Sequence, residues 1–159
     1  MRVLVAYATK YGSTEKCAKL LSEKLNGKVE IINLKEKRDI DLSLYDKVVV
    51  GGSIYAGKIL KEVIEFCNKN IEVLKEKEIG LFICCMREGD SVEEQMKSAF
   101  PVELIGKAVA VSNFGGEFLF KKMNFIDKLI TKKIVKIYTD KSNILDDNIE
   151  NFARLINRS

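Results

Sequence analysis

The sequence contains no histidine and no tryptophan, and it has only one proline among 159 residues. Without histidine there is no imidazole base, no Ser-His or Cys-His nucleophile pair, and none of the common zinc or haem ligand sets. No CxxC spacing occurs among the four cysteines, which are Cys17, Cys67, Cys84 and Cys85. We therefore expect reduced thiols buried in the core and no metal site, with redox-active cysteines as the alternative.

Long hydrophobic runs are also absent. No apolar run approaches the roughly 18 residues of a membrane span, and a strand-like pattern starts at Arg2 without the charged and apolar regions of a secretory signal. Apolar residues make up 47% of the chain and charged residues 31%, which is typical of a globular protein. We expect one domain over residues 1–159, located in the cytoplasm.

Strand-like and helix-like patterns alternate five times along the chain. The expected strands span residues 2–7, 28–33, 47–52, 79–85 and 107–112. The expected helices span residues 14–26, 60–67, 92–99 and 144–158. Four of the strands are apolar on both faces, which is typical of a parallel sheet with helices on both sides. We predict a doubly wound α/β fold with a five-stranded parallel sheet in the order 2-1-3-4-5. In this fold, ligands bind at the carboxyl ends of the strands, so the loops after Tyr7, Gly52 and Cys85 are the candidates.

The first of these loops has the composition of a phosphate site. Its candidate residues are Thr9, Lys10, Tyr11, Gly12, Ser13 and Thr14. A helix start offers unpaired backbone amides and a partial positive charge, hydroxyls add hydrogen bonds, and glycine allows a close approach. The loop has neither the GxxxxGK[ST] nor the GxGxxG pattern, so a single phosphate is favoured over a dinucleotide. The alternative is a plain helix start capped by Ser13 or Thr14.

The second loop has the composition of a wall beside a flat ring, and the third loop is a candidate by its position in the sheet. The second is glycine-rich and has one aromatic face, Tyr55, for stacking; its candidates are Ser53, Ile54, Tyr55, Ala56 and Gly57. The third offers Met86 as a soft apolar surface, and its candidates are Met86, Arg87 and Gly89. A plain strand-to-helix turn is the alternative for the second loop. No residue of the chain is a convincing acid–base catalyst.

The segment from Val3 to Glu15 resembles the first strand and phosphate loop of flavodoxins, whose pattern is [S/T]-x-T-G-x-T. Thr9, Gly12 and Thr14 match this pattern, whereas Tyr11 stands where the family more often has threonine. The resemblance implies noncovalent FMN, with its phosphate in the first loop and its ring between the other two. By Coulomb attraction, Arg87 would stabilise the anionic reduced ring if it points towards the flavin; the alternative is that Arg87 points to solvent and has no such effect.

A basic segment distinguishes the chain from a minimal flavodoxin. Lys121–Lys136 contains six lysines and one acid, for a net charge of +5, while the rest of the chain sums to −1. Apolar residues recur every three or four positions between Leu119 and Ile137, which predicts an extra amphipathic helix over residues 117–137, after the fifth strand. Such a helix can contact a membrane surface or a partner, or it can pack on the sheet with a solvated lysine face. No aromatic-basic motif indicates nucleic acid binding.

The chain as a whole resembles the FMN-dependent, quinone-linked protoporphyrinogen oxidases. The likeness lies in residues 7–15, 51–57, 115–137 and 138–153; residues 85–106 match poorly, and a histidine found near Lys58 in some relatives is missing. It implies electron transfer from a porphyrinogen substrate to a quinone or a redox partner protein, with peripheral contact at the inner face of the membrane through the basic segment. The alternatives are a flavodoxin electron carrier, and a domain that has lost FMN and acts through its basic helix.

Overall fold

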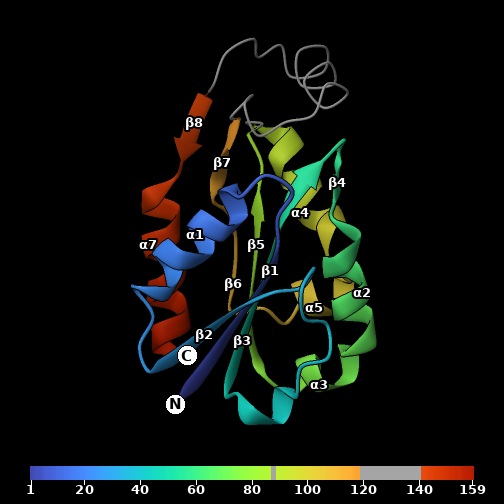
Figure 1. Cartoon of the computed structure of the whole chain (residues 1–159), viewed down its shortest axis with the longest axis vertical. Helices are drawn as coiled ribbons and strands as arrows, with labels where there is room; N and C mark the ends of the chain where they lie inside the picture. Colours follow the sequence, from blue (N-terminus) through green and yellow to red (C-terminus); the bar gives the residue numbers. More distant parts are fainter. Residues whose placement is uncertain (87–88, 119–140) are drawn as a thin grey trace.

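The computed structural model describes residues 1–86, 89–118 and 141–159. A central sheet lies between two layers of helices (Figure 1). The strands are β1 (Arg2–Ala8), β2 (Lys28–Asn33), β3 (Lys47–Tyr55), β4 (Lys58–Ile59), β5 (Glu78–Cys84), β6 (Ala110–Asn113), β7 (Gly115–Phe118) and β8 (Lys141–Ile144). The described helices are α1 (Ser13–Ser22), η1 (Leu42–Leu44), α2 (Lys61–Lys69), α3 (Ile71–Lys75), α4 (Asp90–Ala99), α5 (Val102–Ile105) and α7 (Asp146–Arg158).

The main sheet has the strand order β2-β1-β3-β5-β6, and all of these neighbours run parallel. This confirms the predicted fold and order; the numbering differs because the short β4 pairs antiparallel with the end of β3. A separate two-stranded ribbon, β7–β8, follows the last strand of the sheet. Since the order reverses at β1, the carboxyl ends of β1, β3 and β5 lie together at one edge, which is where ligands bind in such sheets.

Two hydrophobic cores form because the sheet strands are apolar on both faces. One face of the sheet packs on α1 and α7, and the other packs on α2 to α5 (Figure 1). The adjacent Cys84 and Cys85 lie in opposite cores, as expected for neighbours along an extended chain.

All four cysteines are free and buried. Burial raises the pKa of Cys67 to about 12. Burial, and then the nearby Cys17 thiol, raise the pKa of Cys84 well above its ordinary value, so these thiols stay protonated at neutral pH.

Tertiary contacts determine where several helices and strands begin or end. α1 stops at Ser22, earlier than the predicted residue 26, and the Asn26 amide donates to Asn157 Oδ1 on α7 at 2.9 Å. β3 continues past Gly52 to Tyr55, because it turns back onto β4. α7 begins at Asp146 and not at residue 144, because the preceding residues pair with β7 as strand β8.

The predicted amphipathic helix over residues 117–137 is wrong at its start. Glu117 and Phe118 belong to strand β7, where they pair with β8. The remaining residues, including the basic segment Lys121–Lys136, lie outside the described part of the chain. Within the described part, no helix combines the length and the hydropathy needed to cross a bilayer.

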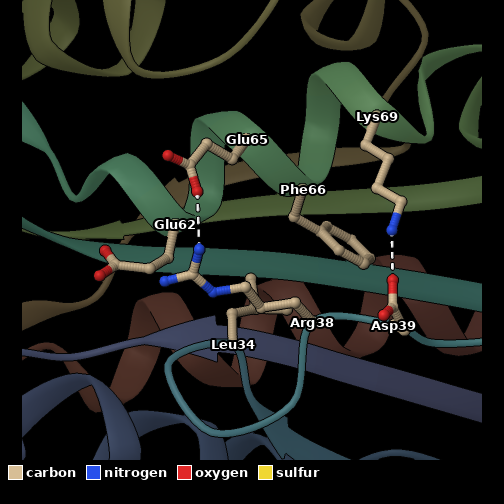
Figure 2. A pocket seen from close by; sticks show the side chains of 7 residues that line it. All are labelled: Leu34, Arg38, Asp39, Glu62, Glu65, Phe66 and Lys69. Carbon is tan, nitrogen blue, oxygen red and sulfur yellow. Dashed lines mark hydrogen bonds and ion pairs between the residues drawn. The ribbon is translucent and has the colours of Figure 1, made fainter.

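A pocket of about 290 Å³ lies between the segment after β2 and helix α2 (Figure 2). Leu34 and Phe66 form its apolar floor. Two ion pairs cross it from the segment to the helix: Arg38 with Glu65, at 3.2 Å, and Lys69 with Asp39. None of the residues that line this pocket belongs to the three candidate loops, so it is not the predicted site.

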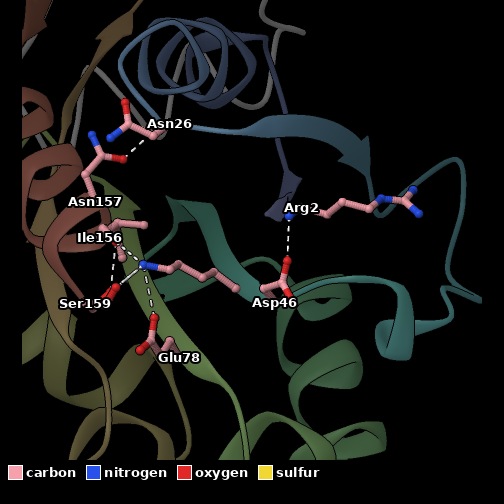
Figure 3. A network of polar contacts seen from close by, with 8 residues as sticks. Arg2, Asn26, Asp46, Glu78, Ile156, Asn157 and Ser159 are labelled. Atoms are coloured by element: carbon pink, nitrogen blue, oxygen red, sulfur yellow. Dashed lines mark hydrogen bonds and ion pairs between the residues drawn. The ribbon is translucent and has the colours of Figure 1, made fainter.

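A buried lysine connects the sheet to the end of α7, and Figure 3 shows its partners Glu78, Ile156 and Ser159. The side chain of Lys47, at the start of β3, is only 6% exposed. Its Nζ donates to the carbonyl oxygens of Ile156, at 2.6 Å, and Ser159, at 2.5 Å, and forms an ion pair with Glu78 at 3.1 Å. The last carbonyls of a helix have no partner within the helix, and Lys47 provides a donor for two of them; the Ile156 carbonyl also accepts from the Ser159 hydroxyl, at 2.8 Å.

Replacing Lys47 by methionine is expected to lower the free energy of unfolding by about 1–3 kcal/mol, because the hydrogen bonds of a charged donor to Ile156 and Ser159 and the ion pair with Glu78 are lost together. Urea unfolding of the purified protein measures this change. Lys28→Met, at an exposed lysine of β2, is the matched control and should leave the midpoint unchanged. Equal stability of Lys47→Met and the wild type would contradict a structural role for this contact.

Candidate functional site

The three candidate loops meet at the carboxyl edge of the sheet. The first joins β1 to α1, the second is the β3–β4 turn, and the third begins at Met86 after β5. Parallel pairing aligns Ala8 with Gly52 and Ser53 with Cys84, so the strand ends that carry the loops are direct neighbours. This arrangement is the one expected from the sheet order, and it places the loops at the upper end of the molecule in Figure 1.

The first loop presents an uncapped helix start. Gly12 is the N-cap of α1 and has a left-handed backbone, with φ 99° and ψ −6°. No side chain among the described residues caps this helix, so the alternative of a cap by Ser13 or Thr14 is wrong. The Gly12 amide donates to Thr9 Oγ1 at 2.9 Å, which braces the loop from within. The amide of Lys16 makes the first bond of the helix, to the Gly12 carbonyl, at 3.1 Å. The preceding amides of the first turn therefore have no partner inside the helix and are suited to binding an anion.

Thr14 connects the first loop to β3. Its side chain is fully buried, and its Oγ1 lies 2.5 Å from Ser53 Oγ. The hydroxyl is thus already bonded to protein and points into the molecule. Thr14 is left with its backbone amide as the group it could offer to a phosphate.

We expect Thr14→Val to lower the free energy of unfolding of the ligand-free protein by about 1–3 kcal/mol. Valine has nearly the same shape but leaves the Ser53 hydroxyl without its partner. Chemical denaturation gives the value, with Ser13→Ala as the control at the half-buried neighbouring hydroxyl. If Thr14→Val unfolds at the wild-type midpoint, the contact does not hold the loop to β3.

The second loop is a hairpin and not a strand-to-helix turn. Ala56 and Gly57 both have positive φ, 48° and 79°, as a two-residue turn between paired antiparallel strands requires. Ile54 packs against the core, so its side chain is committed to the interior of the protein. Lys10 Nζ lies 3.4 Å from the centroid of the Tyr55 ring, which is a cation–π contact between the first and second loops. A flat ligand that stacks on this face of Tyr55 must displace Lys10.

The third loop meets the first one around Gly116 in β7. A Cβ at Gly116 would lie 3.6 Å from Met86 Cγ and Sδ and 3.7 Å from Ser13 Oγ. Gly89 has a positive φ of 70° and open space where a Cβ would point. Arg87, the predicted cation of this loop, lies outside the described residues.

Asn113, at the end of β6, supports the third loop and was not predicted. It is 7% exposed. Its Nδ2 donates to the Cys85 carbonyl at 3.1 Å, and its Oδ1 accepts the amides of Cys85 and Gly115, both at 3.0 Å. The sequence signal that could have identified it is a lone amide at the end of an apolar strand.

The described part of the chain contains two buried side-chain polar atoms without a hydrogen-bond partner, Tyr11 Oη and Gln95 Oε1. Tyr11 belongs to the first loop, and Gln95, on α4, lies beside the turn of the second loop. A buried polar atom without a hydrogen-bond partner lowers the stability of the protein, so such atoms mark places where a ligand can supply the missing partner. Within the same described ranges, no group of three Cys, Asp or Glu side chains is arranged to hold a metal. A phosphorylated ligand with a flat heterocycle fits this set of groups: the amides of the first turn of α1, the ring face of Tyr55, and the two buried polar atoms without a partner.

A family model matches residues 4–144 of this chain, and its description is "Flavodoxin domain". The match spans the main sheet and all three candidate loops. No curated protein sequence matches the chain.

Solved structures show the same fold at low sequence identity. Flavodoxin 2 from Bacillus cereus superposes with a TM-score of 0.61 at 18% identity, over 98% of this chain and 97% of that one. Flavodoxin from Megasphaera elsdenii gives 0.58 at 15%, over 96% and 98%. A rubredoxin oxygen:oxidoreductase from Desulfovibrio gigas gives 0.54 at 17%, over 99% of this chain but only 35% of that one. At these identities the likeness concerns the fold alone.

Proposed function

The chain belongs to the flavodoxin-domain family, and on that premise we propose that it binds FMN noncovalently at the carboxyl edge of the sheet and transfers electrons. The observation that carries the proposal is the uncapped start of α1 at Gly12, beside a positive-φ turn that presents Tyr55. Bound FMN would supply the redox chemistry, since it accepts and donates electrons one or two at a time. The protein's part is to bind and orient it.

The residues divide by the portion of FMN they would contact. The phosphate group would lie among Thr9, Lys10, Tyr11, Gly12, Ser13 and Thr14, bound mainly by backbone amides. One side of the ring would face Ser53, Ile54, Tyr55, Ala56 and Gly57. The other side would face Met86, Arg87 and Gly89. The cation–π contact of Lys10 with Tyr55 suggests how the two parts cooperate, because a bound phosphate attracts the ammonium away from the ring face that a flavin needs.

Purification and reconstitution test this proposal. The purified protein, or the ligand-free protein mixed with FMN, is expected to show the absorbance bands of bound flavin and a quenched flavin fluorescence. A protein that neither carries nor takes up FMN would contradict the proposal, and would leave a domain that has lost its cofactor and acts through its basic segment.

We propose as the finer assignment an oxidoreductase similar to protoporphyrinogen oxidase, with a quinone or a protein as acceptor. The resemblance of four sequence stretches supports it. A flavodoxin electron carrier is the second candidate. This chain covers 97% of the length of the Bacillus cereus flavodoxin, so almost every segment of that protein has a counterpart here. Anaerobic reduction of the bound flavin by protoporphyrinogen, in one two-electron step, supports the oxidase. Reduction by dithionite in two separated steps, with no reaction with protoporphyrinogen, supports the carrier.

Peripheral membrane contact through Lys121–Lys136 is part of the oxidase proposal. A net charge of +5 in this segment would attract anionic lipid. Sedimentation with vesicles that contain phosphatidylglycerol should bring the protein down at low salt, and phosphatidylcholine vesicles should not. Equal recovery with the two lipids would argue against this contact.

A further inference from the structure

Gln95 is a polar residue on the inward face of α4. Four positions further along the helix, Ala99 is 3% exposed, and the adjacent Met96 packs against the core, so this face is the buried one. Glu93 and Glu94 are exposed. Gln95 as a residue is half-buried, but its side-chain oxygen is buried, and packing alone does not explain a carboxamide oxygen at that place.

The carboxamide of Gln95 lies beside the turn of the second loop. Its Nε2 lies 3.9 Å from where a Cβ would stand on Gly57, and it is the one atom of the described residues outside the turn itself within 4 Å of that point. Gly57 and Ala56 are the residues that hold the positive-φ turn. Among the described residues outside the turn, Gln95 is thus the first that a group placed at this point would meet.

The oxygen of the same carboxamide has no partner in the part of the chain that the structure describes. Gln95 Oε1 is buried and accepts no hydrogen bond from any described residue. Other polar groups of this edge, such as Thr14 with Ser53 and Asn113 with Cys85, are paired. An unpaired buried acceptor costs more than an apolar group of the same shape, so its presence calls for a donor that arrives with a ligand.

A carboxamide presents an acceptor and a donor side by side. The pyrimidine portion of an isoalloxazine presents the complementary pair, a ring N3–H next to a carbonyl oxygen. Asparagine and glutamine recognise nucleic acid bases by the same bidentate match. Of the groups on an oxidised flavin ring, N3–H is the only N–H donor.

We propose that Gln95 is a specificity-determining residue of the ring site, whose Oε1 accepts the N3–H of the flavin while its Nε2 faces the neighbouring carbonyl. The inference rests on the proposed function, since it assigns a residue to the ring of the same FMN. It extends the site beyond the three loops, to helix α4.

The experiment compares wild type, Gln95→Met and Glu94→Ala as ligand-free proteins. Methionine fills similar space without an acceptor or donor, and Glu94 is an exposed neighbour on the same helix. Each protein is titrated with FMN and with 3-methyl-FMN, which lacks the N3–H, by fluorescence quenching. The unfolding midpoint of each ligand-free protein is measured in urea.

The inference predicts that Gln95→Met weakens FMN binding about five- to tenfold, and that wild type prefers FMN over 3-methyl-FMN by a similar factor. Gln95→Met should show little preference between the two ligands, and Glu94→Ala should behave as wild type. Without FMN, Gln95→Met should be at least as stable as wild type, because it removes an orphan acceptor.

Two results would overturn the inference while the proposed function stands. The first is that Gln95→Met binds FMN as strongly as the wild type. The second is that Gln95→Met keeps the wild-type preference for FMN over 3-methyl-FMN and is less stable than the wild type without ligand. The second would make Gln95 a structural residue. Failure of the wild type itself to bind FMN is a different outcome, which removes the proposed function and this inference together.

Discussion

Gly51→Ala is expected to lower the free energy of unfolding by about 3 kcal/mol, at the upper end of what overpacking a core costs. A Cβ at Gly51 would lie 2.1 Å from Phe82 Cζ and 2.2 Å from its Cε1, far inside contact distance. The Phe82 ring has no room to retreat, because it stacks on Phe114 with centroids 4.4 Å apart and meets Phe152 edge-on. All three rings are buried, so the methyl group must push a close-packed cluster apart.

Urea unfolding with Gly106→Ala as the control isolates this effect. Gly106 has an ordinary helical backbone, with φ −66°, and the nearest atom to its Cβ position is 3.6 Å away. Alanine there should leave the stability unchanged or raise it slightly, because it restricts the unfolded chain. Wild-type stability of Gly51→Ala would mean that the aromatic cluster behind β3 is not closely packed.

Gly12→Val is expected to weaken FMN binding by about 10- to 100-fold, equivalent to about 1.4–2.8 kcal/mol. Gly12 holds φ 99° at the start of α1, a conformation that a β-branched residue adopts only at a cost of about 1–3 kcal/mol. Relief of that strain turns the amides of the first helical turn away from the phosphate. Binding is measured by titrating the ligand-free protein with FMN.

Riboflavin separates this prediction from a general loss of structure. It has the same ring but no phosphate, so Gly12→Val should change its affinity little, whereas a misfolded variant would lose both ligands. Gly106→Ala, far from the loops in sequence, should bind FMN as the wild type does. Undiminished FMN binding by Gly12→Val would argue that the phosphate is not held at this helix start.

The order of the main sheet could be predicted because its strands are locally apolar and its ligand edge follows from topology. The apolar runs around Val3 and Val49, and the helical spacing of Ala18 and Leu21, are properties of short segments. The β7–β8 ribbon was missed because its strands are more than 20 residues apart, and Gly115 meets Ile144 only in the folded chain. The β4 hairpin was missed because a two-residue turn at Ala56 and Gly57 lacks the usual asparagine or aspartate.

The candidate site could be located from the sequence, but the directions of its side chains could not. Thr14 fits a phosphate loop by pattern, yet its hydroxyl points to Ser53, which is 39 residues away. Lys10 lies on Tyr55, and Asn113 holds the start of the third loop, through contacts that no local pattern contains. Gln95 sits in a helix whose sequence gives no sign of a ligand.

The central claim is that the start of α1 binds the phosphate of FMN, and the most direct measurement is the ratio of the dissociation constants of riboflavin and FMN for the ligand-free wild-type protein. Two or more charge-assisted hydrogen bonds from the first-turn amides predict a ratio of at least about 100. Salt should reduce this ratio, because the contact is electrostatic. Equal affinity for the two ligands would contradict the account.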